Sequence, residues 1–89
     1  MAALFHLAIL SRDKNIFEGD LQSLVAPGEM GYLGILANHA PLMTSLIPGK
    51  ITLKDVSGKI TSFDSKANGF LKVSKNKAII LLDQEEIGS

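Results

Sequence analysis

Residues 50–63, KITLKDVSGKITSF, contain two short runs of residues separated by a turn signal. Ile51 and Leu53 alternate with polar neighbours, which predicts a β-strand with one buried face. Residues 60–63 form a second run of this kind. Between the two runs lies Gly58, which supplies the positive φ that a tight hairpin turn needs. The stretch therefore predicts a β-hairpin.

Turn signals recur along the rest of the chain at a spacing of about 8–12 residues, as in all-β domains. They lie at residues 12–15, 18–20, 27–28, 48–49, 57–58, 68–69 and 75–77. Residues 71–74 alternate between apolar and polar, whereas residues 78–82 are continuously apolar and predict a strand buried on both faces. No long segment has a helical period, so an all-β sandwich or barrel is expected.

Length and composition narrow the class of protein. The 89 residues fit a single domain, which we place at residues 1–83 with a short acidic tail at 84–89. The absence of cysteine excludes disulfides, thiol nucleophiles and zinc–thiolate sites. Nine basic and nine acidic residues give a net charge of zero, which argues against a nucleic-acid binder or a polybasic membrane anchor. The uncharged stretch 30–49 is interrupted by proline and glycine, so short strands are expected there rather than a membrane span.

Catalytic, cofactor and metal motifs are not found. His6 and His39 lie far apart in the sequence and lack metal-ligand spacing, so no metal site is expected. No Gly-x-Ser-x-Gly elbow supports a Ser/His/Asp triad. Gly28, Gly31 and Gly34 follow a GxxGxxG spacing, which is not the dinucleotide fingerprint. The sequence therefore predicts neither catalytic residues nor a bound cofactor.

The central third of the chain is rich in large apolar residues. They are Tyr32, Leu33, Ile35, Leu36, Leu42, Met43, Leu46 and Ile47. An exposed apolar patch on a small domain usually marks a partner interface. The alternative is that all eight belong to the core, and the residues alone leave both open.

Several motifs together resemble one known family. They are residues 17–19 (FEG), 25–28 (VAPG), 31–36 (GYLGIL), 38–42 (NHAPL), 48–49 (PG), 68–73 (NGFLKV) and 77–82 (KAIILL). The combination of GYLGIL with HAPL is highly specific. The chain resembles the epsilon subunit of F-type ATP synthases, whose mitochondrial counterpart is called delta.

The resemblance implies a flattened sandwich of two five-stranded sheets. It also implies a non-catalytic subunit of the central stalk, or rotor, which binds the gamma subunit and the c-ring. Such a subunit couples c-ring rotation, driven by hydrogen ion transport, to ATP synthesis. It would be a peripheral subunit at the cytoplasmic face of the bacterial inner membrane, with the chloroplast thylakoid as the less favoured location. No membrane insertion and no nucleic-acid partner are implied, and the isolated chain is expected to be monomeric.

The resemblance also assigns two contact sites. The gamma-facing residues would be Ser11, His39, Leu42, Met43 and Thr44. The loop facing the c-ring would be Glu29, Met30, Gly31 and Tyr32. Many members carry an acid at the position of Tyr32, so here Tyr32 would act by packing and through its hydroxyl, or Glu29 would supply the charge.

The C-terminal end departs from the typical family pattern. Many members continue into two helices that can inhibit ATP hydrolysis and, in some, bind ATP. This chain stops at Ser89, so we expect neither the inhibitory arm nor the nucleotide site. One alternative is that the sequence is an N-terminal fragment of a full-length epsilon subunit. Another is a small β-sandwich ligand-binding or hydrolytic domain, which would need a concave pocket with convergent polar groups.

Overall fold

The computed structural model describes residues 3–12 and 14–83 of the chain. The strands are β1 (Phe5–Ser11), β2 (Lys14–Gly28), β3 (Gly31–Leu36), β4 (Leu42–Leu46), β5 (Gly49–Asp55), β6 (Ile60–Ser65), β7 (Gly69–Ser74) and β8 (Lys77–Leu82). The described residues contain no helix, and so none that could cross a membrane. The all-β prediction is confirmed, while the predicted tail at 84–89 lies outside the described residues.

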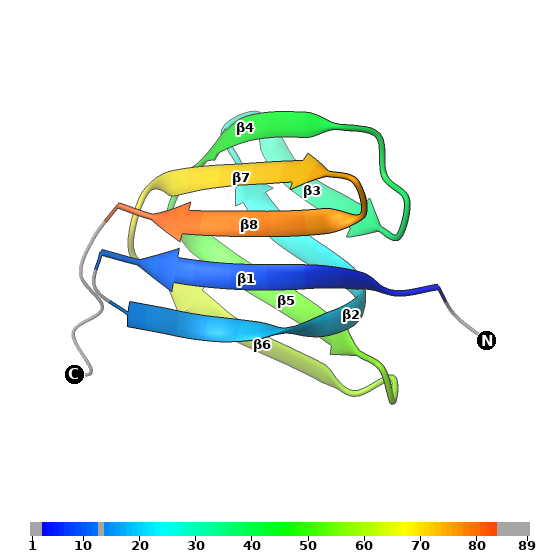
Figure 1. Ribbon diagram of the computed structural model, residues 1–89. Helices are drawn as coiled ribbons and strands as arrows, with labels where there is room; N and C mark the ends of the chain where they lie inside the picture. Colours follow the sequence, from blue (N-terminus) through cyan, green and yellow to red (C-terminus); the bar gives the residue numbers. More distant parts are fainter. Residues whose placement is uncertain (1–2, 13, 84–89) are drawn as a thin grey trace.

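The strands form two layers that belong to one continuous hydrogen-bonded sheet of eight strands. The front layer contains β4, β7, β8, β1 and the N-terminal half of β2, and β3, β5, β6 and the rest of β2 lie behind it (Figure 1). Strand β2 is 15 residues long and pairs with β1 at one end and with β3 and β5 at the other. Its register with β5 shifts between Leu21 and Ser23, where it passes between the layers. The sandwich is therefore built on a shared strand, and not on two separate five-stranded sheets.

The turn expected at residues 18–20 is wrong. Gly19 lies inside β2 and pairs with Leu7 of β1. Glu18 and Asp20 on either side of it point out of the sheet and bind His6 of β1 across the pair. The two acidic residues, which were expected in a solvated turn, instead lie on the exposed face of a strand.

The core fills the space between the two layers with inward-facing side chains from every strand except β6, where Phe63 packs against it. Its large side chains include Leu7, Ile9, Leu24 and Ile80, each 0% exposed. Complete burial of a side chain of this size contributes about 1.5–3 kcal/mol relative to exposure.

The predicted hairpin at residues 50–63 is confirmed. Strands β5 and β6 pair from Gly49 opposite Ser65 to Lys54 opposite Ile60, and Gly58 has φ 89°. The Asp55 carboxylate accepts hydrogen bonds from the backbone N–H groups of Ser57 and Lys59, each at 2.9 Å, and from the Ser57 hydroxyl at 2.8 Å. These bonds favour the charged carboxylate and lower the pKa of Asp55.

The prediction that residues 78–82 are buried on both faces is wrong. Strand β8 alternates between exposed and buried positions. Ile79 and Leu81 remain 40% and 49% exposed, because β8 has the core on one side only. The second face of this strand therefore contributes to the surface of the molecule.

Candidate protein-docking surface

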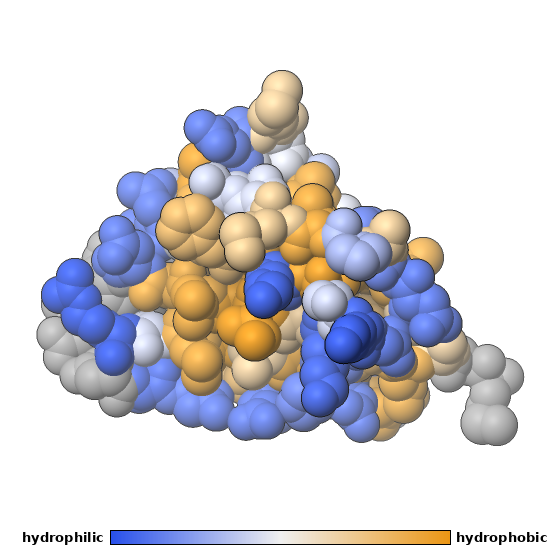
Figure 2. Space-filling view, turned by 45° about the horizontal axis from the view of Figure 1, so that its top comes forward, coloured by the Kyte–Doolittle hydropathy of each residue, from blue (hydrophilic) through white to orange (hydrophobic). Residues whose placement is uncertain are grey.

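The outer face of the front layer carries a patch of apolar side chains. We call it the docking face and define it by Met43, Phe70, Lys72, Ile79 and Leu81, which line a shallow hollow of about 440 Å³. Its four apolar members are 40–67% exposed. Figure 2 shows hydrophobic side chains gathered over this part of the molecule, with hydrophilic ones among and around them.

Strand register explains why these residues meet. Leu81 of β8 pairs with Phe70 of β7, and Ile79 pairs with Lys72. Lys72 in turn pairs with Met43 of β4. Residues that are directly opposite on neighbouring strands point to the same side of the sheet. The β7–β8 hairpin and the more distant strand β4 thus build one surface.

The opposite outer face, on the back layer, carries both polar and apolar side chains. Strands β5 and β6 present Lys50, Thr52 and Lys54 beside Ser62 and Asp64. Polar side chains of this kind are ordinary for a sheet that faces water. The same face also exposes Ile60, which is opposite Lys54, and Leu36 and Tyr32 of β3, at 60–65%. The docking face differs in that its four exposed apolar side chains line one hollow, which makes it a candidate interaction site.

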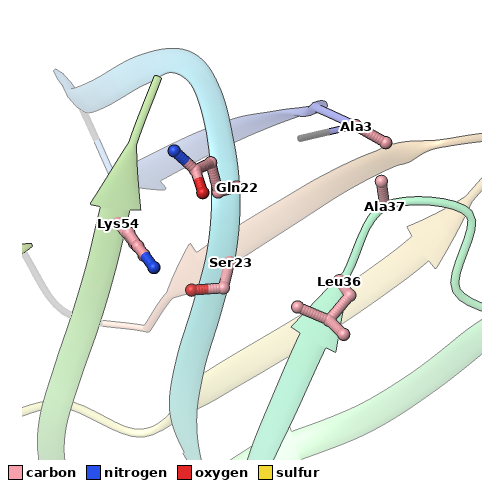
Figure 3. A pocket seen from close by; sticks show the side chains of 6 residues that line it. All are labelled: Ala3, Gln22, Ser23, Leu36, Ala37 and Lys54. Atoms are coloured by element: carbon pink, nitrogen blue, oxygen red, sulfur yellow. The ribbon is translucent and has the colours of Figure 1, made fainter. Parts of the chain in front are cut away.

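A hollow of about 400 Å³ lies beside the back layer, lined by Ala3, Gln22, Ser23, Leu36, Ala37 and Lys54. Ser23 and Lys54 are opposite each other on β2 and β5, and Leu36 and Ala37 line another side (Figure 3). None of these lining side chains is an acid or a histidine, so they offer no general acid–base pair. Among residues 3–12 and 14–83, no group of three histidine, cysteine or acidic side chains is arranged to hold a metal ion.

A charged cluster borders the front layer at β1 and β2. The two ring nitrogens of His6 lie 3.1 Å from the Asp20 carboxylate and 2.9 Å from the Glu18 carboxylate. The Asn15 amide donates to the other Glu18 oxygen at 3.0 Å. The hydrogen bonds to Asp20 and Glu18 raise the pKa of His6, and the bonds from His6 and Asn15 lower the pKa of Glu18.

The residues expected to face the c-ring lie on the hairpin that joins β2 to β3. Gly28 pairs with Gly31, so Glu29 and Met30 form a two-residue tip, and Gly31 has φ 127°. Met30 is fully exposed. The Tyr32 hydroxyl accepts a hydrogen bond from the Lys50 N–H at 3.1 Å, which ties this side chain to β5. Glu29 is thus the charged group at the tip.

The residues expected to face gamma are divided by the structure. Met43 lies on the docking face, whereas Leu42 and Thr44 alternate with it toward the inner side of β4, and Leu42 packs against the core. Ser11 has a buried hydroxyl without a hydrogen-bond partner among the described residues. His39 lies between β3 and β4, with its Nδ1 2.7 Å from the carbonyl oxygen of Ala40. The roles of these residues stay predictions.

Sequence reasoning missed Phe70, Ile79 and Leu81 as surface residues. The signal was the alternation of residues 71–74, which places Phe70 and Lys72 on one face. A strand that pairs with this segment has one face toward the core and one toward the solvent as well, and this applies to the apolar run 78–82. The central apolar residues likewise divide between core and surface: Ile35 and Leu46 are buried, and Tyr32 and Met43 are exposed.

The fold and this surface define the class of protein, a β-sandwich domain with a hollow lined by apolar side chains on the outer face of its front layer. The sequence profile described as "ATP synthase, Delta/Epsilon chain, beta-sandwich domain" matches residues 4–88. The chain belongs to this family.

Curated relatives are named ATP synthase epsilon chain. The one from Caulobacter vibrioides is 37% identical over 81 residues, which cover 91% of this chain and 92% of the relative. The one from Desulfitobacterium hafniense is 40% identical over 88 residues, covering 99% of this chain and 65% of the relative. The one from Dichelobacter nodosus is 38% identical, covering 94% of this chain and 58% of the relative. The chain thus spans about three fifths of the length of the latter two.

Solved structures show the same fold at low sequence identity. A chain in the Euglena gracilis mitochondrial ATP synthase structure (OSCP/F1/c-ring) matches with a TM-score of 0.84 at 21% identity, covering 94% of this chain and 53% of that chain. A chain in the Tetrahymena thermophila mitochondrial ATP synthase structure (central stalk/c-ring) matches with a TM-score of 0.71 at 17% identity, covering 93% and 66% respectively. These likenesses support the fold.

Proposed function

We propose that this chain is a non-catalytic central-stalk subunit of an F-type ATP synthase that couples c-ring rotation to ATP synthesis. The observation that carries the proposal is the apolar docking face on a domain of this family. The origin of the two structural neighbours, in assemblies that contain a c-ring, supports it. If the sequence is part of a longer epsilon subunit, the same face would serve the longer protein.

The docking face is proposed to bind gamma. Met43, Phe70, Ile79 and Leu81 each expose 40–67% of their surface, so a partner that covers them would remove substantial apolar area from water. Aromatic residues and methionine are enriched in protein interfaces. Ser11, His39, Leu42 and Thr44 would then act at the margin of the contact or by supporting β4.

The hairpin tip is proposed to face the c-ring. Met30 is the most exposed large apolar side chain of the described residues, and Glu29 beside it carries a charge. A short tip of this kind offers one apolar and one charged contact to polar loops. We propose a peripheral position at the cytoplasmic face of a bacterial inner membrane, and the bacterial origin of the relatives supports this.

The test is co-expression with the gamma subunit from the same source. We expect a stable one-to-one complex that survives gel filtration. Phe70→Asp should weaken it about thirtyfold or more, because a charge replaces an aromatic contact at the centre of the face. Ser62→Asp is the matched control, since Ser62 is exposed on the back layer, and it should bind as the wild type does.

Two results would contradict the proposal. The first is the absence of any complex between the wild-type chain and gamma. The second is equal binding by Phe70→Asp and Ser62→Asp when circular dichroism shows that both variants keep their β structure.

A further inference from the structure

Lys72 places a positive charge among the apolar side chains of the docking face. It lies between Met43 and Ile79 in one row of paired residues, and Phe70 and Leu81 form the next row. All five line the same hollow. A partner that covers the four apolar side chains must therefore also approach the Lys72 ammonium.

Lys72 has no charged partner within the described structure. Within residues 3–12 and 14–83, no carboxylate oxygen lies within 4.0 Å of its ammonium. Glu18, in the same row of paired positions, is three strands away across β8 and β1, which corresponds to about 14 Å at the usual strand spacing. Glu18 is also engaged by His6 at 2.9 Å.

A partner that covers the docking face would bury the Lys72 ammonium, and a buried cation needs a counter-charge. In the isolated chain, water solvates the Lys72 ammonium, and a purely apolar partner would remove that water and give nothing in return. A carboxylate placed opposite the ammonium restores the lost solvation and fixes the register of the two surfaces. Resting on the function proposed above, we infer that the docking face binds a segment of gamma in which one carboxylate, flanked by apolar side chains, pairs with Lys72.

The direction in which one substitution changes the affinity for gamma separates this inference from the alternative that gamma presents only apolar groups. Lys72→Met keeps a long unbranched side chain and removes the charge. If gamma presents a carboxylate, the variant leaves that carboxylate unpaired, and the affinity should fall at least about thirtyfold. If gamma presents only apolar groups at this point, methionine removes the cost of covering a cation, and the affinity should stay equal or rise.

The experiment compares the dissociation constants of the full chain and its variants for purified gamma by titration calorimetry at one fixed salt concentration. Lys72→Arg keeps the charge and should bind within a few-fold of the wild type. Lys54→Met removes a positive charge from the back layer and should bind as the wild type does. Circular dichroism of each variant checks that the β structure is intact.

Each outcome gives a decision. Loss with Lys72→Met alone supports the inference. Equal or tighter binding by Lys72→Met overturns it, and so does an equal loss with Lys72→Arg, because the site would then read shape and not charge. An equal loss with Lys54→Met also overturns it, since net charge would explain the effect. If the wild-type chain fails to bind gamma at all, the proposed function fails instead.

Discussion

Gly69 should be one of the positions least tolerant of a side chain. It is buried at the start of β7, where it pairs with Leu82 of β8 on one side and Leu46 of β4 on the other. A Cβ built on Gly69 would overlap the carbonyl oxygen of Leu81 and lie 3.1 Å from its carbonyl carbon and 3.2 Å from the Leu82 Cα. These are backbone atoms, so no side-chain rotation can relieve the contact.

The backbone of β8 has little freedom to retreat from a new methyl group. It is hydrogen-bonded to β7 on one side and to β1 on the other, and the N–H of Asp83 bonds the carbonyl of Asn68 at 2.7 Å. Overpacking a well-packed interior usually costs about 1–3 kcal/mol, and clashes with backbone fall at the upper end or beyond. We therefore expect Gly69→Ala to lower the free energy of unfolding by about 3 kcal/mol, out of a total of about 5–15 kcal/mol.

Gly34→Ala is the matched control. Gly34 is exposed in β3, and a Cβ there would have no atom within 4 Å. Because its φ lies outside the left-handed region, alanine should be neutral or stabilise the protein by up to about 1 kcal/mol. Urea unfolding followed by circular dichroism measures both changes, provided that the m-values agree. A Gly69→Ala variant within 1 kcal/mol of the wild type would refute the steric argument.

The other two predictions concern pH. Asp20 and Glu18 raise the pKa of His6, so the folded state binds the imidazolium proton more tightly than the unfolded state does. The resulting gain in stability is fully present below pH 6.5, the usual pKa of histidine, and is lost as the pH rises through the pKa of His6 in the folded state. Urea midpoints at pH 6 and 8 should show this fall in the wild type and a smaller one in His6→Gln. The pKa of Asp55 is lowered in the folded state. The charged Asp55 carboxylate therefore stabilises the fold above pH 3.8, the usual pKa of aspartate, and this stabilisation is lost as the pH falls through the pKa of Asp55 in the folded state. Asp55→Ala should thus melt below the wild type at neutral pH and converge with it in acid, and a constant difference would contradict the role of the charge.

How much the sequence could predict depended on how local each feature was. The β5–β6 hairpin is specified by residues that are neighbours in the chain, with Gly58 in the turn and alternation on both sides, so it was predicted correctly. The course of strand β2 through residues 18–20 was not predicted. Gly19 indicates a turn when no partner strand is known, but here it pairs with β1. Of the docking face, Met43 was expected at an interface, whereas Phe70, Ile79 and Leu81 were missed. Strand β8 follows β7 after a two-residue turn, but its exposed positions are as apolar as its buried ones, so the run 78–82 shows no alternation.

The two proposed contact sites are connected by strand β4. Met43 on this strand belongs to the docking face, and two residues later the Ser45 carbonyl accepts a hydrogen bond from the N–H of Glu29 at 3.1 Å. A second bond joins the Ile47 N–H to the Pro27 carbonyl at 2.9 Å, near the end of the β2 arm of the same hairpin. No loop lies between the two sites. A displacement of the hairpin tip relative to β4 must therefore stretch or break these backbone hydrogen bonds. The proposed role, the transmission of rotation between two partners, requires this stiffness, which here comes from the pairing of β4 with the base of the β2–β3 hairpin.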